Sequence, residues 1–104
     1  MMDKATSINL AKRFSEKIVT LFPVKSIILF GSYSNDTAKL HSDIDIAVVV
    51  ENFEGDFLKT SKQLFTLSRD IDLRIEPILI DLQDDPSGFL REINKNGTLI
   101  YQSA

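Results

Sequence analysis

The chain has 104 residues, of which 43% are hydrophobic, and it contains no cysteine. This length suits one domain with one hydrophobic core, and the lack of cysteine excludes disulfides, zinc–thiolate sites and thiol nucleophiles. The formal net charge of −3 at pH 7 gives no basic surface for a phosphate backbone, so we expect no direct polynucleotide binding.

The first 30 residues predict a helix followed by a strand. Apolar residues recur at spacings of three and four from Asp3 to Phe22, with charged residues between them, as in an amphipathic helix. Pro23 should end this helix, because its ring disfavours helical geometry at the residue before it. The β-rich segment over residues 25–30, which Gly31 ends, predicts the first strand.

The middle of the chain predicts a strand, a helix and another strand. The sequence SDIDIAVVV over residues 42–50 is typical of a largely buried strand, and apolar residues among cations over residues 56–70 predict a second helix. Residues 73–82 predict a third strand that contains Pro77. Proline cannot donate a backbone hydrogen bond, so this strand should be an edge strand or should direct the missing donor toward solvent.

The last segment predicts a helix and a short strand. Asp85 and Pro86 resemble a helix cap followed by a proline in the first turn, and the helix should end near Asn96–Gly97. Residues 98–101 predict a final strand. This order of elements predicts an α/β or α+β fold, with a small mixed sheet flanked by helices in a single domain over residues 1–104.

Two carboxylates open the second predicted strand. Successive side chains of a strand point to opposite faces, so Asp43 and Asp45 share one face, about 6.6 Å apart along the backbone. Such a pair can bind one divalent cation or bridge two, and magnesium is the natural choice for carboxylate oxygens. No lysine or arginine within the strand neutralises the pair. The alternative is that Asp43 caps the strand and Asp45 lies on a solvated face.

Gly31 and Ser32 follow the first predicted strand directly. Glycine lets a backbone approach a phosphate closely, and the serine hydroxyl adds a donor. An ordinary turn is the alternative interpretation of this pair. An anion cradle and a cation-binding carboxylate pair on consecutive elements together suit a nucleoside triphosphate with magnesium.

Gly31-Ser32, a spacer and the segment Ser42-Asp43-Ile44-Asp45 resemble the GS…(S)DxD signature of the nucleotidyltransferase superfamily that includes DNA polymerase β. The resemblance is closest to the minimal nucleotidyltransferases of that superfamily. The segment FLREINKNGTLIY, residues 89–101, is similar to the closing helix and strand of those proteins.

The resemblance implies an enzyme that uses two Mg²⁺ ions. It would transfer a nucleoside monophosphate from ATP or another nucleoside triphosphate to a hydroxyl acceptor and release pyrophosphate. By position, Gly31 and Ser32 would hold the triphosphate, and Asp43 and Asp45 would bind both metal ions.

The family also has a third carboxylate, on the following strand, which binds metal and helps to activate the acceptor. Glu76 is the best match in this chain, with Asp81 and Asp72 as alternatives. Aspartate is commoner than glutamate at this position in the minimal members. A second departure is Asp36, at a position where the family often has glycine.

Small members of the family are often encoded with a helical HEPN protein and act as antitoxins that adenylylate the toxin. The resemblance therefore implies a HEPN-type partner. Glu76 and Asp36 favour an alternative from another class: a catalytically inactive binding module that acts as an antitoxin by direct contact. A small-molecule nucleotidyltransferase, similar to those that modify aminoglycosides, is a third possibility.

The expected location is the cytoplasm, without a membrane interaction. The first residues lack the apolar core of a secretory signal, and no later run is long enough to span a bilayer. A homo-oligomer is compatible with the sequence.

Overall fold

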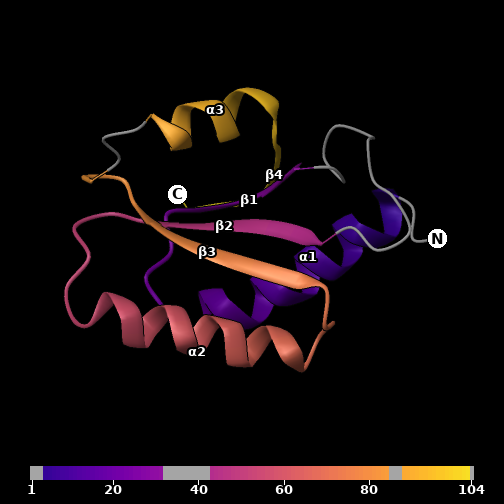
Figure 1. The fold of residues 1–104 in the computed structure, drawn as a ribbon, viewed down its shortest axis with the longest axis horizontal. Helices are drawn as coiled ribbons and strands as arrows, with labels where there is room; N and C mark the ends of the chain where they lie inside the picture. The colour runs from indigo at the N-terminus through magenta and orange to yellow at the C-terminus, as the bar shows by residue number, and fades with distance from the viewer. Residues whose placement is uncertain (1–3, 32–42, 85–87, 104) are drawn as a thin grey trace.

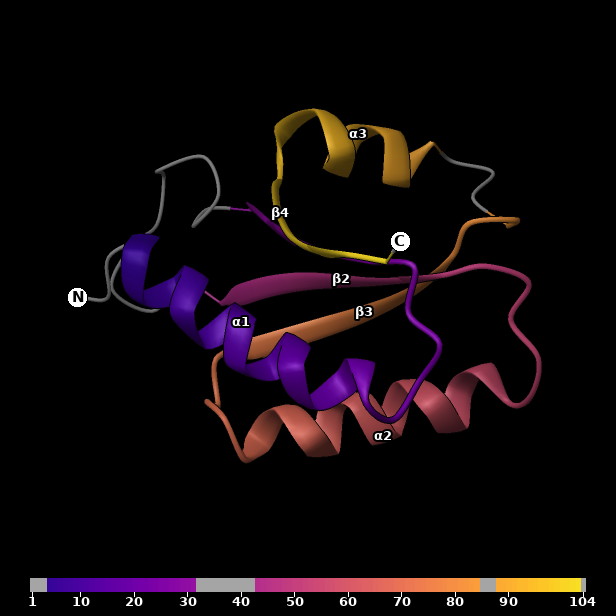
Figure 2. The same cartoon turned by 180° about the vertical axis from the view of Figure 1, so that it is seen from behind.

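The computed structural model describes residues 4–31, 43–84 and 88–103. Within these ranges the chain forms a mixed α+β fold with the predicted order of elements. The elements are α1 (Lys4–Val19), β1 (Ser26–Phe30), β2 (Ile44–Val50), α2 (Phe57–Arg69), β3 (Ile75–Asp81), α3 (Phe89–Asn96) and β4 (Thr98–Gln102). Figures 1 and 2 show α1 and α2 on one face of the sheet and α3 on the other.

The sheet has the strand order β3-β2-β1-β4. Strand β1 is antiparallel to both β2 and β4, whereas β2 and β3 are parallel, so the sheet is mixed as predicted. An antiparallel neighbour begins where the strand beside it ends. The end of β1 and the beginnings of β2 and β3 therefore meet at the same end of the sheet, and this arrangement positions the site.

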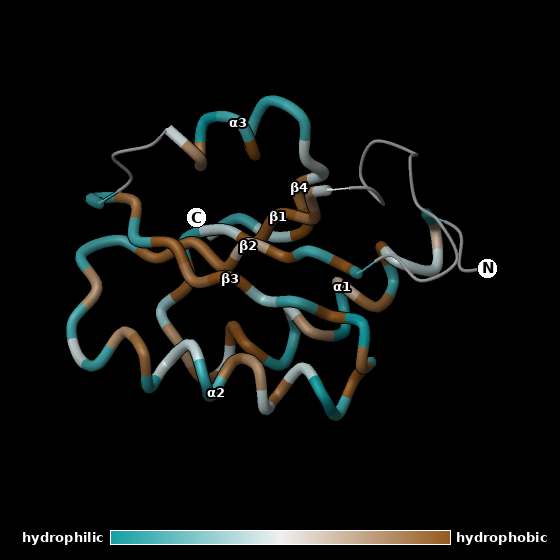
Figure 3. The backbone as a smooth tube through the Cα atoms, in the orientation of Figure 1, coloured by the Kyte–Doolittle hydropathy of each residue, from teal (hydrophilic) through white to brown (hydrophobic). Residues whose placement is uncertain are grey.

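Each face of the sheet has its own apolar core, and Figure 3 shows the strands mostly brown where they cross the middle of the molecule. Alternate side chains of the strands point to opposite faces, so each strand contributes to both cores. The larger core joins the sheet to α1 and α2, and the smaller core joins it to α3. The smaller core contains Ile28, Ala47, Val49, Ile80, Leu90 and Ile93.

The prediction that Pro77 lies on an edge strand is confirmed, because β3 is the last strand on its side of the sheet. The amide of Leu82, just past β3, donates to Val50 O, so by alternation Pro77 directs its backbone toward the open edge. The guanidinium of Arg69 donates to Leu73 O and to Ile75 O on that side. Proline and arginine therefore disfavour the addition of another strand to this edge.

The second helix and the final strand lie as predicted, with Asp56 as the N-cap of α2, where its Oδ1 accepts a hydrogen bond from Lys59 N at 3.0 Å. The second and third strands are each shorter than predicted: β2 begins at Ile44 instead of residue 42, and β3 spans Ile75–Asp81 instead of residues 73–82. Within the described ranges, no helix is both long enough and apolar enough to cross a membrane.

Two helix boundaries differ from the prediction. Helix α1 ends at Val19 instead of Phe22, because the amides of Leu21 and Phe22 both donate to Ile18 O in a closing turn. The predicted start of the last helix at Asp85–Pro86 is wrong, since α3 begins only after Gly88, whose φ of +72° is not helical. Residues 85–87 themselves lie outside the described residues. The predicted end is confirmed by Gly97, whose amide donates to Ile93 O at 2.7 Å.

Candidate active site

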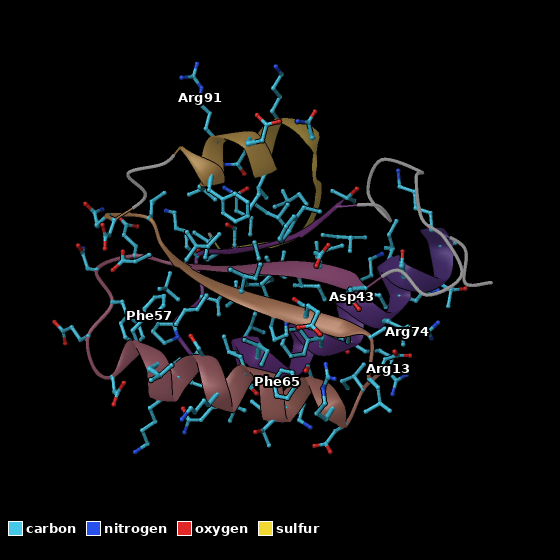
Figure 4. All side chains as sticks on the ribbon, viewed as in Figure 1. Arg13, Asp43, Phe57, Phe65, Arg74 and Arg91 are labelled. Atoms are coloured by element: carbon cyan, nitrogen blue, oxygen red, sulfur yellow. The ribbon has the colours of Figure 1, made fainter. Side chains whose placement is uncertain are left out.

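The strand register brings four predicted site residues to one end of the sheet. Asp45 pairs with Phe30 of β1 on one side and with Glu76 of β3 on the other. Paired residues share a face, so the carboxylates of Asp45 and Glu76 point to the same side of the sheet. Gly31 follows Phe30, and Asp43 precedes Asp45 by two positions, just before β2 begins. Figure 4 shows Asp43 at the start of β2, near the start of β3.

Gly31 has a φ of +76°, in the left-handed region that side chains rarely adopt. A Cβ added at Gly31 would overlap Oδ2 of Asp45 and would lie 3.3 Å from its Cγ. Only glycine therefore lets the Asp45 carboxylate lie directly against this turn. Two residues named in the sequence analysis lie outside the described residues. They are Ser32, the predicted triphosphate ligand, and Asp36, which stands where the family often has glycine.

The carboxylates at this end of the sheet are electrostatically coupled. The pKa of Asp45 is raised above its usual value, first by burial and then by the negative charges of Asp43 and Glu76. Carboxylate oxygens are the ligands that Mg²⁺ prefers, so the residues present fit the predicted ion.

The side-chain oxygens of Asp43, Asp45 and Glu76 do not form a preassembled metal site. Over the described ranges, no three His, Cys, Asp or Glu side chains lie close enough to hold one metal ion. The backbone places the three carboxylates together, but mutual repulsion favours rotamers that keep like charges apart. Their convergence on a metal therefore stays a prediction.

Asp72, one alternative for the third carboxylate, has a local structural role. Its Oδ1 accepts hydrogen bonds from Arg74 N at 2.8 Å and Arg74 Nε at 2.9 Å, and its Oδ2 accepts one from Arg74 Nη2 at 2.9 Å. These hydrogen bonds lower the pKa of Asp72, although partial burial opposes the effect. Asp72 precedes β3, and its carboxylate is committed to this turn.

Asp81, the other alternative, lies at the opposite end of β3. Its Oδ2 accepts a hydrogen bond from Phe53 N at 3.2 Å, and its Oδ1 accepts one from Gln83 N at 2.9 Å. Of the three candidates, Glu76 is the one that pairs with Asp45. The geometry therefore supports Glu76 as the third carboxylate.

A pocket of about 260 Å³ lies beside Gly31, between the end of β1 and α3. This pocket was not predicted from the sequence, in which residues 89–96 indicate a closing helix. A signal was present, since Phe89, Glu92 and Asn96 recur at spacings of three and four and therefore share one helix face. The pocket is lined by Phe30, Gly31, Phe89, Glu92, Ile93 and Asn96.

Comparison with known protein families gives one match over most of the chain. The family model described as polymerase beta, nucleotidyltransferase, matches residues 12–104. A curated protein of Methanocaldococcus jannaschii, provisionally named a protein adenylyltransferase, is 33% identical over 89 residues. The match covers 80% of this chain and 60% of that relative, so the chain spans less than two thirds of the relative's length.

Several solved structures share the fold. A provisionally assigned nucleotidyltransferase from Sulfolobus solfataricus has a TM-score of 0.69 and 23% identity, and the match covers 95% of this chain and 83% of that one. A toxin–antitoxin structure with AMP-PNP has a TM-score of 0.67 and 26% identity, over 91% of this chain and 74% of the other. A third structure is a tri-AMPylated HEPN toxin of Shewanella oneidensis in complex with an MNT antitoxin. Its TM-score is 0.56, with 24% identity over 89% of this chain and 73% of that one.

Proposed function

The chain belongs to the polymerase β nucleotidyltransferase family, and we propose that it transfers a nucleoside monophosphate from ATP or another nucleoside triphosphate to a hydroxyl acceptor. The observation that carries this proposal is that the backbones of Asp43, Asp45 and Glu76 lie at one end of the sheet, beside Gly31. Phosphoryl chemistry needs positioned groups and neutralised charge more than covalent help from the protein. A few residues on neighbouring strands can therefore suffice.

Each residue has a distinct proposed role. Gly31 and Ser32 would hold the triphosphate, and Asp43, Asp45 and Glu76 would hold two Mg²⁺ ions. When bound, Mg²⁺ supplies positive charge that stabilises the attacking and leaving oxygens of an in-line displacement. The acceptor oxygen would attack the α-phosphorus and the α–β phosphoanhydride bond would break, releasing pyrophosphate. Glu76 would accept the hydroxyl proton, because it lies on the edge strand, where an acceptor can approach.

We also propose that the acceptor belongs to a HEPN-type protein partner and that residues 1–104 form one minimal domain. The support for the partner is that two of the similar structures are toxin–antitoxin complexes, one with AMP-PNP and one with a tri-AMPylated HEPN toxin. The support for the nucleotide being ATP is the same pair of structures together with the curated relative's name.

One observation favours a second candidate function. Among the described residues, no three carboxylates lie close enough together to hold one metal ion. An antitoxin that acts by contact alone, without catalysis, does not need such a site. The two functions differ in one measurable property, since only the enzyme moves the labelled α-phosphate of ATP onto its partner.

Glu76→Gln is expected to reduce nucleotidyl transfer at least about a hundredfold, because it removes both a negative charge and the proposed proton acceptor. The measurement is incorporation from α-labelled ATP into the HEPN-type partner, with magnesium present. Asp81→Asn is the matched control, since it removes a carboxylate from the other end of the same strand. Full transfer by Glu76→Gln, or its loss in a folded Asp81→Asn variant, would reject Glu76 as the third carboxylate. No transfer by the wild-type chain would favour the contact antitoxin.

A further inference from the structure

The pocket beside Gly31 lies on the same face of the sheet as Asp45, since Phe30 lines the pocket and pairs with Asp45. Its opposite wall comes from α3, which packs over this face (Figure 1). A triphosphate held at Gly31 would therefore have the pocket as its immediate neighbour. The inference below rests on the proposed function, because it assigns a role to this pocket in binding the same substrate.

The apolar part of the pocket suits a flat ring. The rings of Phe30 and Phe89 meet edge to face, with centroids 5.7 Å apart and planes at 87°. Ile93, which is 3% exposed, contributes an aliphatic surface, and Phe89 remains 40% exposed. An exposed aromatic ring beside a phosphate-binding turn is a surface on which a nucleobase can stack.

The polar part of the pocket suits a hydrogen-bond donor and does not suit a phosphate. Asn96 Nδ2 donates to Glu92 Oε1 at 2.7 Å, which holds the Glu92 carboxylate at the pocket. A carboxylate repels phosphate oxygens, so this end of the pocket disfavours the triphosphate itself. The same carboxylate accepts hydrogen bonds from amino groups, as acidic side chains do with the amino group of cytosine.

We infer that this pocket binds the base of the nucleoside triphosphate, and that Glu92 selects a base with an exocyclic amino group, such as adenine. Phe89 would stack on the base, and Glu92 would accept a hydrogen bond from the amino group. Glu92 and Phe89 are therefore specificity-determining residues for the nucleotide, separate from the carboxylates that surround the reacting phosphate.

Calorimetric titration in the presence of Mg²⁺ tests the role of Glu92. The probes are ATP, purine riboside triphosphate, which lacks only the amino group, and tripolyphosphate, which lacks base and sugar. The wild-type chain should bind ATP about tenfold more tightly than purine riboside triphosphate, as one hydrogen bond to a charged group would give. Glu92→Ala should abolish this difference without weakening the binding of tripolyphosphate.

Arg91→Ala is the matched control, since Arg91 is adjacent on the same helix and points away from the sheet (Figure 4). It should retain the preference for ATP. Phe89→Ala should weaken ATP binding about tenfold without affecting tripolyphosphate, and Phe89→Tyr, which keeps the ring, should restore it. Melting temperatures of all variants will show whether each remains folded.

The possible outcomes separate this inference from the proposed function. Equal binding of ATP and purine riboside triphosphate by the wild-type chain would overturn the role of Glu92. ATP binding that Phe89→Ala leaves unchanged would overturn the stacking role. In both cases tripolyphosphate binding would leave the proposed function intact. If neither triphosphate nor tripolyphosphate binds, the proposed function fails, and the base pocket fails with it.

Discussion

Asp45→Asn is expected to abolish nearly all nucleotidyl transfer, by about a thousandfold, while making the fold more stable at pH 7. Asp45 is the central carboxylate, because it pairs with Glu76 and lies against Gly31. Removing its charge removes a proposed metal ligand, and several kcal/mol of transition-state stabilisation depend on such a ligand. The measurements are transfer from labelled ATP and urea unfolding of the two proteins.

The gain in stability follows from the direction of the pKa shift. The pKa of Asp45 is raised above the ordinary value of 3.8 by burial and by the charges of Asp43 and Glu76. The folded state therefore binds the proton more tightly than the unfolded state does. As pH rises from the ordinary value through the raised one, stability falls, and above that window the full penalty of the charge is present. Asparagine carries no charge, so the free energy of unfolding at pH 7 should rise, by a small amount because solvent screens this partly exposed charge.

Asp72→Asn is the control with the opposite sign. The pKa of Asp72 is lowered by its hydrogen bonds with Arg74, so its charge stabilises the fold above the ordinary pKa and this contribution is lost as pH falls through the lowered value. Asp72→Asn should therefore reduce stability at pH 7, by about 0.5–1 kcal/mol, and leave transfer unchanged. A less stable Asp45→Asn protein, or one with wild-type transfer, would show that this carboxylate is a structural group.

Gly31→Ala is the second change for which we expect a large effect. A side chain at a φ of +76° strains the backbone, and its Cβ would overlap the Asp45 carboxylate. The fold should lose about 1–3 kcal/mol of stability. Transfer should fall about a hundredfold, because the carboxylate must move away from the turn and a small misplacement of catalytic groups has a large effect on rate.

Alanine substitutions at two other glycines distinguish the effect of backbone strain from the effect of displacing the Asp45 carboxylate. Gly88 has nearly the same backbone angle, with a φ of +72°, and an added Cβ there meets nothing within 4 Å. Gly88→Ala should therefore be destabilised by strain alone. Gly55, with a φ of +114° and open space around it, provides the same comparison far from the site and should keep its activity. Equal loss of transfer in Gly31→Ala and Gly55→Ala would mean that the contact with Asp45 has no catalytic role.

Much of the fold could be predicted from the sequence because its periodicities are strong. The helical spacing before Pro23 and the uninterrupted apolar run after Asp45 identify α1 and β2, and Pro77 identifies an edge strand. The start of α3 could not be predicted, because Asp85–Pro86 offers a stronger local signal than Gly88, whose left-handed conformation depends on the path of the whole chain.

The candidate site could be predicted in its parts but not in its assembly. The spacing of Asp43 and Asp45 places them on one face, but the pairing of Asp45 with Glu76 depends on the parallel register of β2 and β3, which no local pattern specifies. The contact of the Asp45 carboxylate with Gly31 likewise depends on a tertiary approach. The position of the pocket could not be predicted, because the packing of α3 against β1 depends on tertiary structure and not on a local pattern.

The most direct measurement is Mn²⁺ binding followed by electron paramagnetic resonance, with AMP-PNP present and no acceptor. The signal of free Mn²⁺ should decrease until about two ions are bound per chain, as a two-metal phosphoryl site requires. The Asp43→Ala, Asp45→Ala double variant should bind no more Mn²⁺ than the nucleotide binds by itself. A wild-type chain that also takes up no Mn²⁺ beyond that of the free nucleotide would contradict the proposal that these carboxylates form a metal site.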